Sequence, residues 1–249
     1  MNPSNPGAHF SISSLQKFTL NDTRVWFIRI SIDNLQETVA EIIQIIADVS
    51  WIEGLTSISK ESFIARAQPT IDTLIKELTN YLESCDNKMI KTIGETVVSV
   101  SARSVIERSL QYRALPIAEL IKQKVRGNPG FDFHHEKDGL MIVFGEAKYV
   151  SNSNAYNRAI SQIVKFIADK KHLKDIPDIE RFVSPSVSNN IHSCQSDRDR
   201  FCYSAAFSIV GKNLDDQKLI NNIKNNDHFK ELVSQNHKEL VLVAVNING

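Results

Sequence analysis

The sequence predicts an α/β fold with a mixed central sheet flanked by helices. From residue 89 onward, short apolar runs rich in β-branched and aromatic residues alternate with longer segments whose apolar residues recur every three or four positions. The resulting order of helix, strands, helix, strand, helix and strand is typical of an α/β sandwich. The chain has 249 residues, 42% of them hydrophobic and 23% charged, which fits a globular protein with one large domain or two modest ones.

The N-terminal part is predicted to hold a strand followed by helices. Residues 1–14 are polar and contain two prolines, which indicates a loose tail or an edge. "TRVWFIRISID" at 23–33 has the β-branched and aromatic residues of a strand. Residues 34–50 have the spacing of an amphipathic helix, with Asp33 or Asn34 as its cap.

A second helical segment follows, in which Pro69 is expected to break or kink the helix. The best candidate for a domain boundary is "CDNK" at 85–88. We therefore expect an α-rich N-terminal region over residues 1–88, which would serve as a partner-binding or regulatory surface. The main domain would span residues 89–249.

Beyond residue 88 the predicted elements follow one another without an internal repeat. They are a helix at 89–115, a helix or strand at 117–125, a hairpin at 126–150 with its turn at 137–139, a helix at 154–171, a loop with short elements at 172–199, a strand at 200–211, a helix at 214–235 and a buried strand at 239–247.

Composition and motifs exclude several classes of protein. The N-terminus lacks the basic and apolar segments of a secretory signal, and no apolar run approaches the ~20 residues that span a bilayer, so we expect a cytoplasmic protein. The three cysteines lack the spacing of a disulfide framework or a zinc ribbon. His134 and His135 lack zinc-ligand spacing too, and we expect one at the core edge and the other in solvent.

A small group of charged residues lies at the predicted hairpin. In "FGEAKY", Glu146 and Lys148 end an apolar strand, and because they are two residues apart they point to the same face of the sheet. The hairpin would bring Asp132, in "GFDFH", beside Glu146. Without a further partner, Glu146 and Lys148 would form an ion pair at the end of the strand, which contributes little to stability if it is exposed. A second carboxylate adds repulsion unless a cation is present.

Two carboxylates and a lysine at one end of a sheet suit the hydrolysis of a phosphodiester. Mg²⁺ prefers oxygen ligands, neutralises the scissile phosphate and acidifies a bound water. The ammonium of Lys148 would orient or deprotonate the attacking water and stabilise developing charge. Glu95, in "IGETVV", is a candidate fourth group acting through an outer-shell water, and equally a first-turn acid that favours its helix dipole. Glu107, three helical turns further on, ranks below it.

These motifs resemble the D…E-x-K core of the PD-(D/E)XK nuclease superfamily over about the last two-thirds of the chain. "GFDFH" and "MIVFGEAKY" carry the resemblance, "GETVV" resembles the superfamily's acidic helix, and Phe131 stands where the motif has its proline. The resemblance implies a restriction-endonuclease-like core and Mg²⁺-dependent cleavage of DNA or RNA. It also implies Asp132, Glu146 and the carbonyl of Ala147 as metal ligands, and Lys148 as the catalytic lysine.

Within the superfamily, the motifs are most similar to those of the nuclease component of Hachiman-type anti-phage systems. That resemblance implies a role in anti-phage defence together with a helicase, a DNA-translocating ATPase bound in part through residues 1–88. Basic and acidic residues balance at 29 each, whereas a free-standing DNA binder usually carries excess positive charge. We therefore expect the isolated chain to be a poor or latent nuclease.

A basic run is the best local candidate for contact with a phosphate backbone, although such runs are more often solvated faces. It comprises Arg103, Arg108, Arg113, Lys122, Lys124 and Arg126, set against Glu107 and Glu119. Within it, Lys122, Lys124 and Arg126 are the candidate nucleic-acid-binding residues.

Two other functions stay open. A non-catalytic interaction module would keep the nuclease fold as a scaffold, but it has no need of Asp132, Glu146 and Lys148 together. A stand-alone restriction endonuclease needs its own recognition insertion, for which the connection at 172–199 is the candidate.

Overall fold

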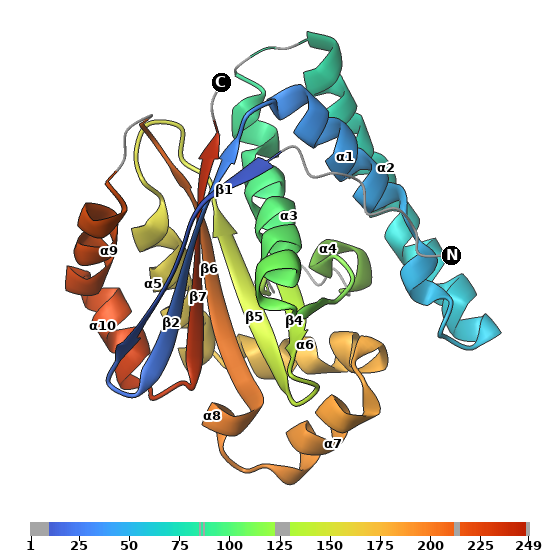
Figure 1. The fold of residues 1–249 in the computed structure, drawn as a ribbon. Helices are drawn as coiled ribbons and strands as arrows, with labels where there is room; N and C mark the ends of the chain where they lie inside the picture. The colour runs from blue at the N-terminus through green and yellow to red at the C-terminus, as the bar shows by residue number, and fades with distance from the viewer. Residues whose placement is uncertain (1–9, 85, 87, 123–129, 212–214, 248–249) are drawn as a thin grey trace.

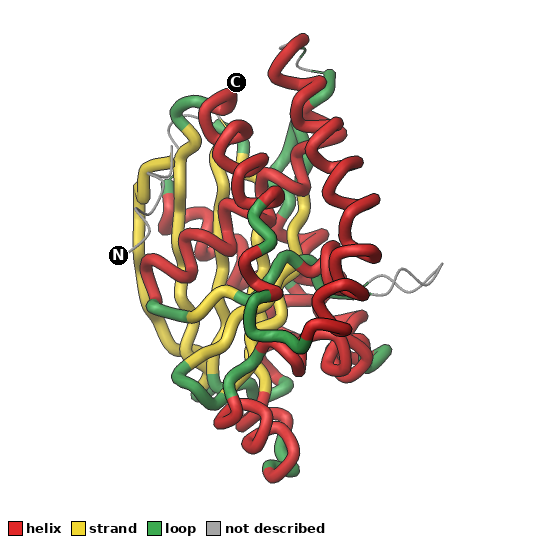
Figure 2. The backbone as a smooth tube through the Cα atoms, turned by 90° about the vertical axis from the view of Figure 1, so that its right-hand side faces the viewer, coloured by secondary structure: helices red, strands yellow, loops and turns green. Residues whose placement is uncertain are grey.

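The fold is described from a computed structural model, which places residues 10–84, 86, 88–122, 130–211 and 215–247. These residues form one seven-stranded, curled, mixed sheet with helices on both faces (Figures 1 and 2). The predicted α/β class with a mixed central sheet is confirmed.

The sheet combines parallel and antiparallel pairing. In spatial order its strands are β1 (Phe10–Leu20), β2 (Thr23–Ile32), β7 (Glu239–Ile247), β6 (Phe201–Ile209), β5 (Met141–Lys148), β4 (Phe133–Lys137) and β3 (Arg113–Ala114). The run β2, β7, β6 and β5 is parallel, whereas β1, β4 and β3 each pair antiparallel with a neighbour. The central strands are almost continuously apolar because both faces of the sheet are covered.

The described part of the chain begins with a β-hairpin, so the expectation of an α-rich N-terminal region is wrong. β1 and β2 are joined at Asn21 and Asp22, which have φ values of 46° and 63°. Asn and Asp tolerate this left-handed conformation, which two-residue hairpin turns require. β2 then pairs in parallel with β7, so the hairpin belongs to the common sheet. The division of the chain at residue 88 stays a prediction.

Helices cover both faces of this sheet. They are α1 (Leu35–Ala47), α2 (Ser57–Ser84), α3 (Ile90–Leu110), α4 (Ala118–Ile121), α5 (Tyr156–Ala168), α6 (Lys171–Ile179), α7 (Pro185–Ser193), α8 (Asp197–Arg200), α9 (Asp216–Asn225) and α10 (Asp227–Ser234), with 3-10 turns η1 (Ser50–Ile52) and η2 (Glu180–Phe182). Figure 1 shows α3 across one face, with α1 and α2 outside it, and α5, α9 and α10 belong to the other face. No helix in the described ranges has both the length and the apolar character of a membrane span.

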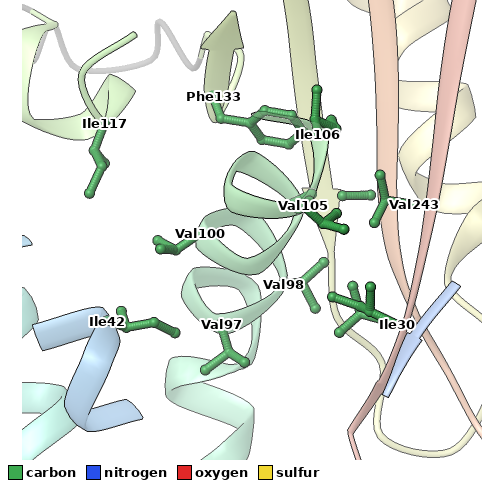
Figure 3. Close-up of a cluster of buried hydrophobic side chains, with 14 of the residues drawn as sticks. Ile30, Ile42, Val97, Val98, Val100, Val105, Ile106, Ile117, Phe133 and Val243 are labelled. Atoms are coloured by element: carbon green, nitrogen blue, oxygen red, sulfur yellow. The ribbon is translucent and has the colours of Figure 1, made fainter. Parts of the chain in front are cut away.

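The core between α3 and the sheet is made of branched aliphatic side chains. Figure 3 shows Val98 and Val105 of α3 on the side of Ile30 from β2 and Val243 from β7. Ile42 of α1 lies on the opposite side of α3. All five are at most 2% exposed, and each buried side chain of this size contributes about 1.5–3 kcal/mol. Because α3 is apolar on both sides, it serves as the inner layer that anchors α1 and α2.

Several predicted boundaries need correction. The connection at 172–199 does hold short elements, α6, η2, α7 and α8, but they make it largely helical and not a loop. Segment 214–235 forms two helices because the Asn226 side chain caps a second one by accepting from the Phe229 N–H at 3.1 Å. α2 continues through Pro69, so the helix is not broken there, and a kink at Pro69 stays a prediction. Its apolar stripe packs against α1 and α4 and outweighs one lost hydrogen bond.

The helix expected at 89–115 ends at Leu110. The next residue, Gln111, takes the left-handed conformation with φ of 58°, a common way to end a helix. The following residues form β3, which pairs with β4. The described part of segment 117–125, for which helix and strand were both open, begins with α4.

Candidate functional site

The hairpin of β4 and β5 places the predicted acidic residues at one end of the sheet. The two strands pair antiparallel as far as Phe133 opposite Gly145. Three residues separate the paired Lys137 and Met141, and two of them, Asp138 and Gly139, have φ values of 53° and 64°, the left-handed conformation common in short hairpin turns. The predicted hairpin and its turn are therefore confirmed. Because β4 begins at Phe133, the last residues of β5 extend beyond it.

Asp132 lies where a longer β4 would have continued. Its backbone N–H donates to the Gly145 carbonyl at 2.8 Å, and its Oδ2 accepts from the backbone N–H of Ala147 at 2.7 Å. Gly145 is required here because a Cβ would lie only 2.1–2.4 Å from atoms of the Phe133 ring. The segment ahead of β4 thus docks on the end of β5 and carries the Asp132 carboxylate to the neighbourhood of Glu146.

Glu146 and Lys148 lie together, as their spacing predicts. Glu146 is buried, with 1% of its side chain exposed, and its Oε1 lies 2.8 Å from Lys148 Nζ. Lys148 Nζ also lies 3.4 Å from Oε1 of Glu95, a largely exposed residue of α3. Oε2 of Glu146 has no hydrogen-bond partner among the described residues. The structure therefore gathers Glu95, Asp132, Glu146 and Lys148 into one cluster.

In this cluster the carboxylates outnumber the one ammonium group, that of Lys148. Burial raises the pKa of Asp132 to about 6, against the opposing effects of the Ala147 N–H and Lys148. Burial, and then the Asp132 carboxylate, raise the pKa of Glu146 well above its ordinary value although Lys148 lowers it. Burial disfavours the Lys148 ammonium, but Glu146, Asp132 and Glu95 more than offset this and raise its pKa. Two acids that bind protons too tightly indicate a site short of positive charge.

The residues present fit a hard divalent cation. Asp132 Oδ1 and Glu146 Oε2 make no hydrogen bond within the described ranges, and carboxylate oxygens are ligands that Mg²⁺ prefers. A hollow of about 40 Å³ beside the cluster, lined in part by Glu95 and Asp132, has room for water. In the part of the chain that the structure describes, no three His, Cys, Asp or Glu side chains form a metal-binding group. A cation here would be held by the two carboxylates, the Ala147 carbonyl and water.

A buried aspartate that the sequence did not single out fixes the segment that carries Asp132. Oδ2 of Asp175 accepts from the Phe131 N–H at 3.0 Å, and it lies 3.0 Å from Lys122 Nζ and 3.5 Å from His134 Nε2. Burial raises the pKa of Asp175, but His134 and Lys122 together bring it below its ordinary value. Asp175 therefore stays ionised and holds the backbone next to Asp132. No local pattern marks Asp175, because it falls in the segment predicted as a loop with short elements.

The candidate nucleic-acid-binding residues divide into two groups. Lys122 lies next to the site, but its ammonium pairs with Asp175, so its charge is compensated within the protein. Lys124 and Arg126 lie outside the described residues. A contact between these three residues and nucleic acid stays a prediction.

The two candidate helical acids occupy different environments. Glu95 contacts Lys148, as described above. Glu107 instead accepts from the backbone N–H of Ala114, the last residue of β3, at 3.1 Å. The geometry therefore favours Glu95 as the helical acid of this site.

His134 and His135 are both fully buried, so the expectation that one of them faces solvent is wrong. His134 faces Asp175 of α6, while His135 Nε2 lies 2.9 Å from the Arg103 carbonyl of α3. Burial lowers the pKa of His135 to about 3. Neighbouring strand residues do point to opposite faces, but α3 packs against β4 on the side of His135 and Asp175 of α6 faces His134.

Comparison with models of known protein families and with curated proteins found no match. The cluster itself combines two carboxylates with free oxygens, a charged lysine and a solvent-accessible glutamate at one sheet end. Such a set can hold a hard cation and can stabilise developing negative charge, which are the requirements of metal-assisted hydrolysis.

The raised pKa of Asp132 predicts a pH dependence of stability for the metal-free protein. Between about pH 4 and pH 6 the folded chain holds a proton that the unfolded chain releases, so the free energy of unfolding falls as pH rises through this window. The loss from Asp132 amounts to at most about 3 kcal/mol at about 1.4 kcal/mol per pKa unit. The variant Asp132→Asn lacks this titration but retains an acceptor for the Ala147 N–H. Urea unfolding of both proteins in EDTA measures the difference, and parallel pH curves would contradict the prediction.

Proposed function

We propose that the chain is a Mg²⁺-dependent nuclease that hydrolyses phosphodiester bonds of nucleic acid, with DNA as the first candidate, on a restriction-endonuclease-like core. The observation that carries the proposal is the Glu146 carboxylate, buried beside Asp132 with one oxygen unpartnered among the described residues. A buried carboxylate without full compensation costs several kcal/mol. A cation shared by Glu146 and Asp132 offsets that cost, and Lys148 supplies a fixed positive charge next to the same point.

Each residue has a distinct role in this proposal. Asp132, Glu146 and the carbonyl of Ala147 hold Mg²⁺, which when bound neutralises the scissile phosphate and lowers the pKa of a bound water. The raised pKa of Lys148 keeps it protonated, so it acts as a hydrogen-bond donor to the developing negative charge and not as a base. Glu95 orients the Lys148 ammonium from the solvent side.

The two alternatives find less support in the geometry. A non-catalytic scaffold gains nothing from a buried carboxylate with an unpartnered oxygen, because an apolar residue would be more stable there. For a stand-alone restriction endonuclease, α7 is a poor recognition element. Its Asn190 donates to the Leu140 carbonyl at 2.8 Å, just ahead of β5, whereas Glu146 and Lys148 lie at the far end of that strand.

A helicase-type partner is part of the proposal, with anti-phage defence as the setting. The supporting observation is the balance of 29 basic and 29 acidic residues, which gives little general attraction for a phosphate backbone. A DNA-translocating ATPase would deliver the strand to the site and bind in part through residues 1–88. Because β2 lies inside the sheet, deletion of residues 1–88 would remove an internal strand. Substitutions on the surfaces of α1 and α2 are therefore the better test of partner binding.

The test is a cleavage assay with the purified chain on single-stranded and duplex DNA and RNA, with Mg²⁺ and with EDTA. Slow, Mg²⁺-dependent cleavage at high enzyme concentration is expected. Efficient cleavage of plain duplex DNA at physiological salt would contradict the need for a partner. If no substrate were cleaved at the highest enzyme concentration, the nuclease assignment of the isolated chain would fail.

A further inference from the structure

A large cavity lies apart from the acidic cluster. It has a volume of about 1080 Å³ and is bounded by α1 and η1 on one side and by the C-terminal half of α3, β3 and η2 on the other. Its lining includes Arg103, Arg108, Arg113 and Arg181 together with the aromatic residues Trp51 and Phe182. Ligand pockets typically measure about 300–1,000 Å³, so this cavity can hold a sizeable flexible ligand.

Arg108 and Arg181 are the uncompensated cations of this cavity. Both are exposed, and neither forms an ion pair with a carboxylate of the described residues. Arg108 lies over the Phe10 ring with its guanidinium carbon 5.2 Å from the centroid, and Arg181 lies 5.8 Å from the centroid of Phe63. The rings orient the two guanidinium groups without neutralising them, so their N–H donors stay available to an anion.

Three carboxylates, those of Glu41, Asp48 and Glu107, line the cavity beside its four arginines. Arg113 pairs with Glu136. Arg103 donates from Nε to the Leu115 carbonyl at 2.8 Å, and the carboxylates of Glu107 and Asp48 act on it favourably. Arg103 and Arg113 are therefore less available to bind an anion in the cavity. Arg108 and Arg181 are its exposed arginines outside such pairing, although the three carboxylates of the wall reduce the net positive charge of the lining.

Trp51 adds an aromatic surface for flat ligands, whereas Phe182 on the same wall is buried. Trp51 and Phe182 meet edge to face with their centroids 5.5 Å apart, and Trp51 is half-buried on the cavity wall. Aromatic side chains next to arginines are typical of sites that hold unpaired bases and their phosphates. This combination points to a nucleotide chain as the occupant.

The cavity is connected to the acidic cluster by one stripe of α3. Glu95 and Ser99 line the small hollow beside Asp132, and Arg103 and Glu107 line the large cavity, at successive intervals of four residues. Ile117 borders both spaces. From Glu95 to Arg108 the helix rises about 20 Å at 1.5 Å per residue, the length of about six stacked nucleotides at 3.4 Å each.

We infer that this cavity binds the single-stranded nucleic acid that flanks the scissile phosphate. In this inference the nucleic-acid strand runs from the acidic cluster along α3 to Arg108 and Arg181. This path rests on the proposed nuclease function, which places the scissile phosphate at the acidic cluster. The substrate class is thereby narrowed to nucleic acid with an unpaired stretch next to the cleavage point, because the cavity accommodates a few nucleotides and not a duplex.

The experiment measures binding without cleavage. Fluorescence anisotropy in EDTA follows labelled single strands of ~6 and ~12 nucleotides, within the range of known single-strand sites, and a matched duplex. The full chain is compared with the double variant Arg108→Gln/Arg181→Gln. The matched control is Arg158→Gln/Lys165→Gln, two exposed residues of α5 on the other face of the sheet, which changes the net charge equally.

The cavity variant is expected to bind single strands about tenfold more weakly than the control. The slope of log affinity against log salt should be shallower by about 1.4, because each lost phosphate contact to a single strand accounts for about 0.7. Equal affinity of the two variants, or stronger binding of the duplex than of the single strand, would overturn the inference. So would full displacement of the strand by AMP at similar affinity, because that result identifies a mononucleotide pocket. The binding assay does not depend on cleavage. If the chain shows no Mg²⁺-dependent cleavage, the nuclease proposal fails, but the binding results still test the inference about the cavity.

Discussion

Replacing Lys148 with alanine is expected to lower the rate of nucleic-acid cleavage by about 10²–10³-fold, the usual effect of removing one preorganised donor to a developing negative charge. The ammonium lies 2.8 Å from Glu146 and 3.4 Å from Glu95, so it is held in place before any substrate arrives. Because its pKa is raised, the lost contribution is that of a fixed charge. Rates measured over a range of substrate concentrations should show the loss in kcat, with little change in KM.

Two companion variants separate catalysis from folding. Lys165→Ala removes an exposed lysine from α5 and should leave the cleavage rate unchanged. Lys148→Arg keeps the positive charge and should restore part of the rate. Removing Lys148 also deprives Glu146 of its ion-pair partner, so the thermal unfolding of each variant must be recorded beside its rate. Normal turnover in a folded Lys148→Ala protein would remove Lys148 from the mechanism.

The hairpin that carries this site could be predicted from the sequence because its signals are local. The apolar run of β5 is bounded by Asp138 and Gly139, whose positive φ values are those of a short hairpin turn. The two-residue spacing of Glu146 and Lys148 fixes their common side of the strand without any knowledge of the rest of the fold. The proximity of Asp132 then follows from the pairing of β4 with β5.

What could not be predicted depends on contacts between distant parts of the chain. Asp175 reaches the Phe131 N–H across 44 residues, and no local pattern marks it for that role. The burial of Glu146 depends on how helices cover the sheet and not on its own neighbours in sequence. The same is true of the pairing of β2 with β7, which places an N-terminal strand beside a C-terminal one.

The N-terminal hairpin carries only a weak local signal in the sequence. β1 alternates between exposed and partly buried residues, because it forms the edge of the sheet. Its alternation is interrupted by a register shift between Ile12 and Ser14, which hides the period of two. The turn uses Asn21 and Asp22 without glycine, so it lacks the strongest hairpin signature. The polar composition of residues 1–14 is compatible with a loose tail or an edge, and from Phe10 onward the structure shows the edge.

Replacing Glu146 with glutamine is expected to abolish Mg²⁺-dependent cleavage and, in the absence of the metal, to stabilise the protein. Burial and the Asp132 carboxylate raise the pKa of Glu146, so at neutral pH the folded state is penalised for a group that is readily ionised when unfolded. Glutamine has nearly the same shape, removes the repulsion from Asp132 and can still accept a hydrogen bond from Lys148. A gain of about 1 kcal/mol would raise Tm by about 2–4 °C in a chain of this size.

Thermal unfolding in EDTA and in Mg²⁺ separates the two effects. In the wild-type chain Mg²⁺ should raise Tm, because a ligand that binds only the folded state stabilises it. In Glu146→Gln the Tm in EDTA should be higher than that of the wild type, and added Mg²⁺ should have no effect. Glu95→Gln is the matched control, since Glu95 is largely exposed and belongs to the same cluster, and its Tm should still respond to Mg²⁺. A Glu146→Gln protein that is less stable in EDTA, or that still responds to Mg²⁺, would show that this carboxylate serves the fold and not a metal. If Glu146→Gln is more stable in EDTA and no longer responds to Mg²⁺, then Glu146 lowers the stability of the metal-free protein and serves to bind the cation.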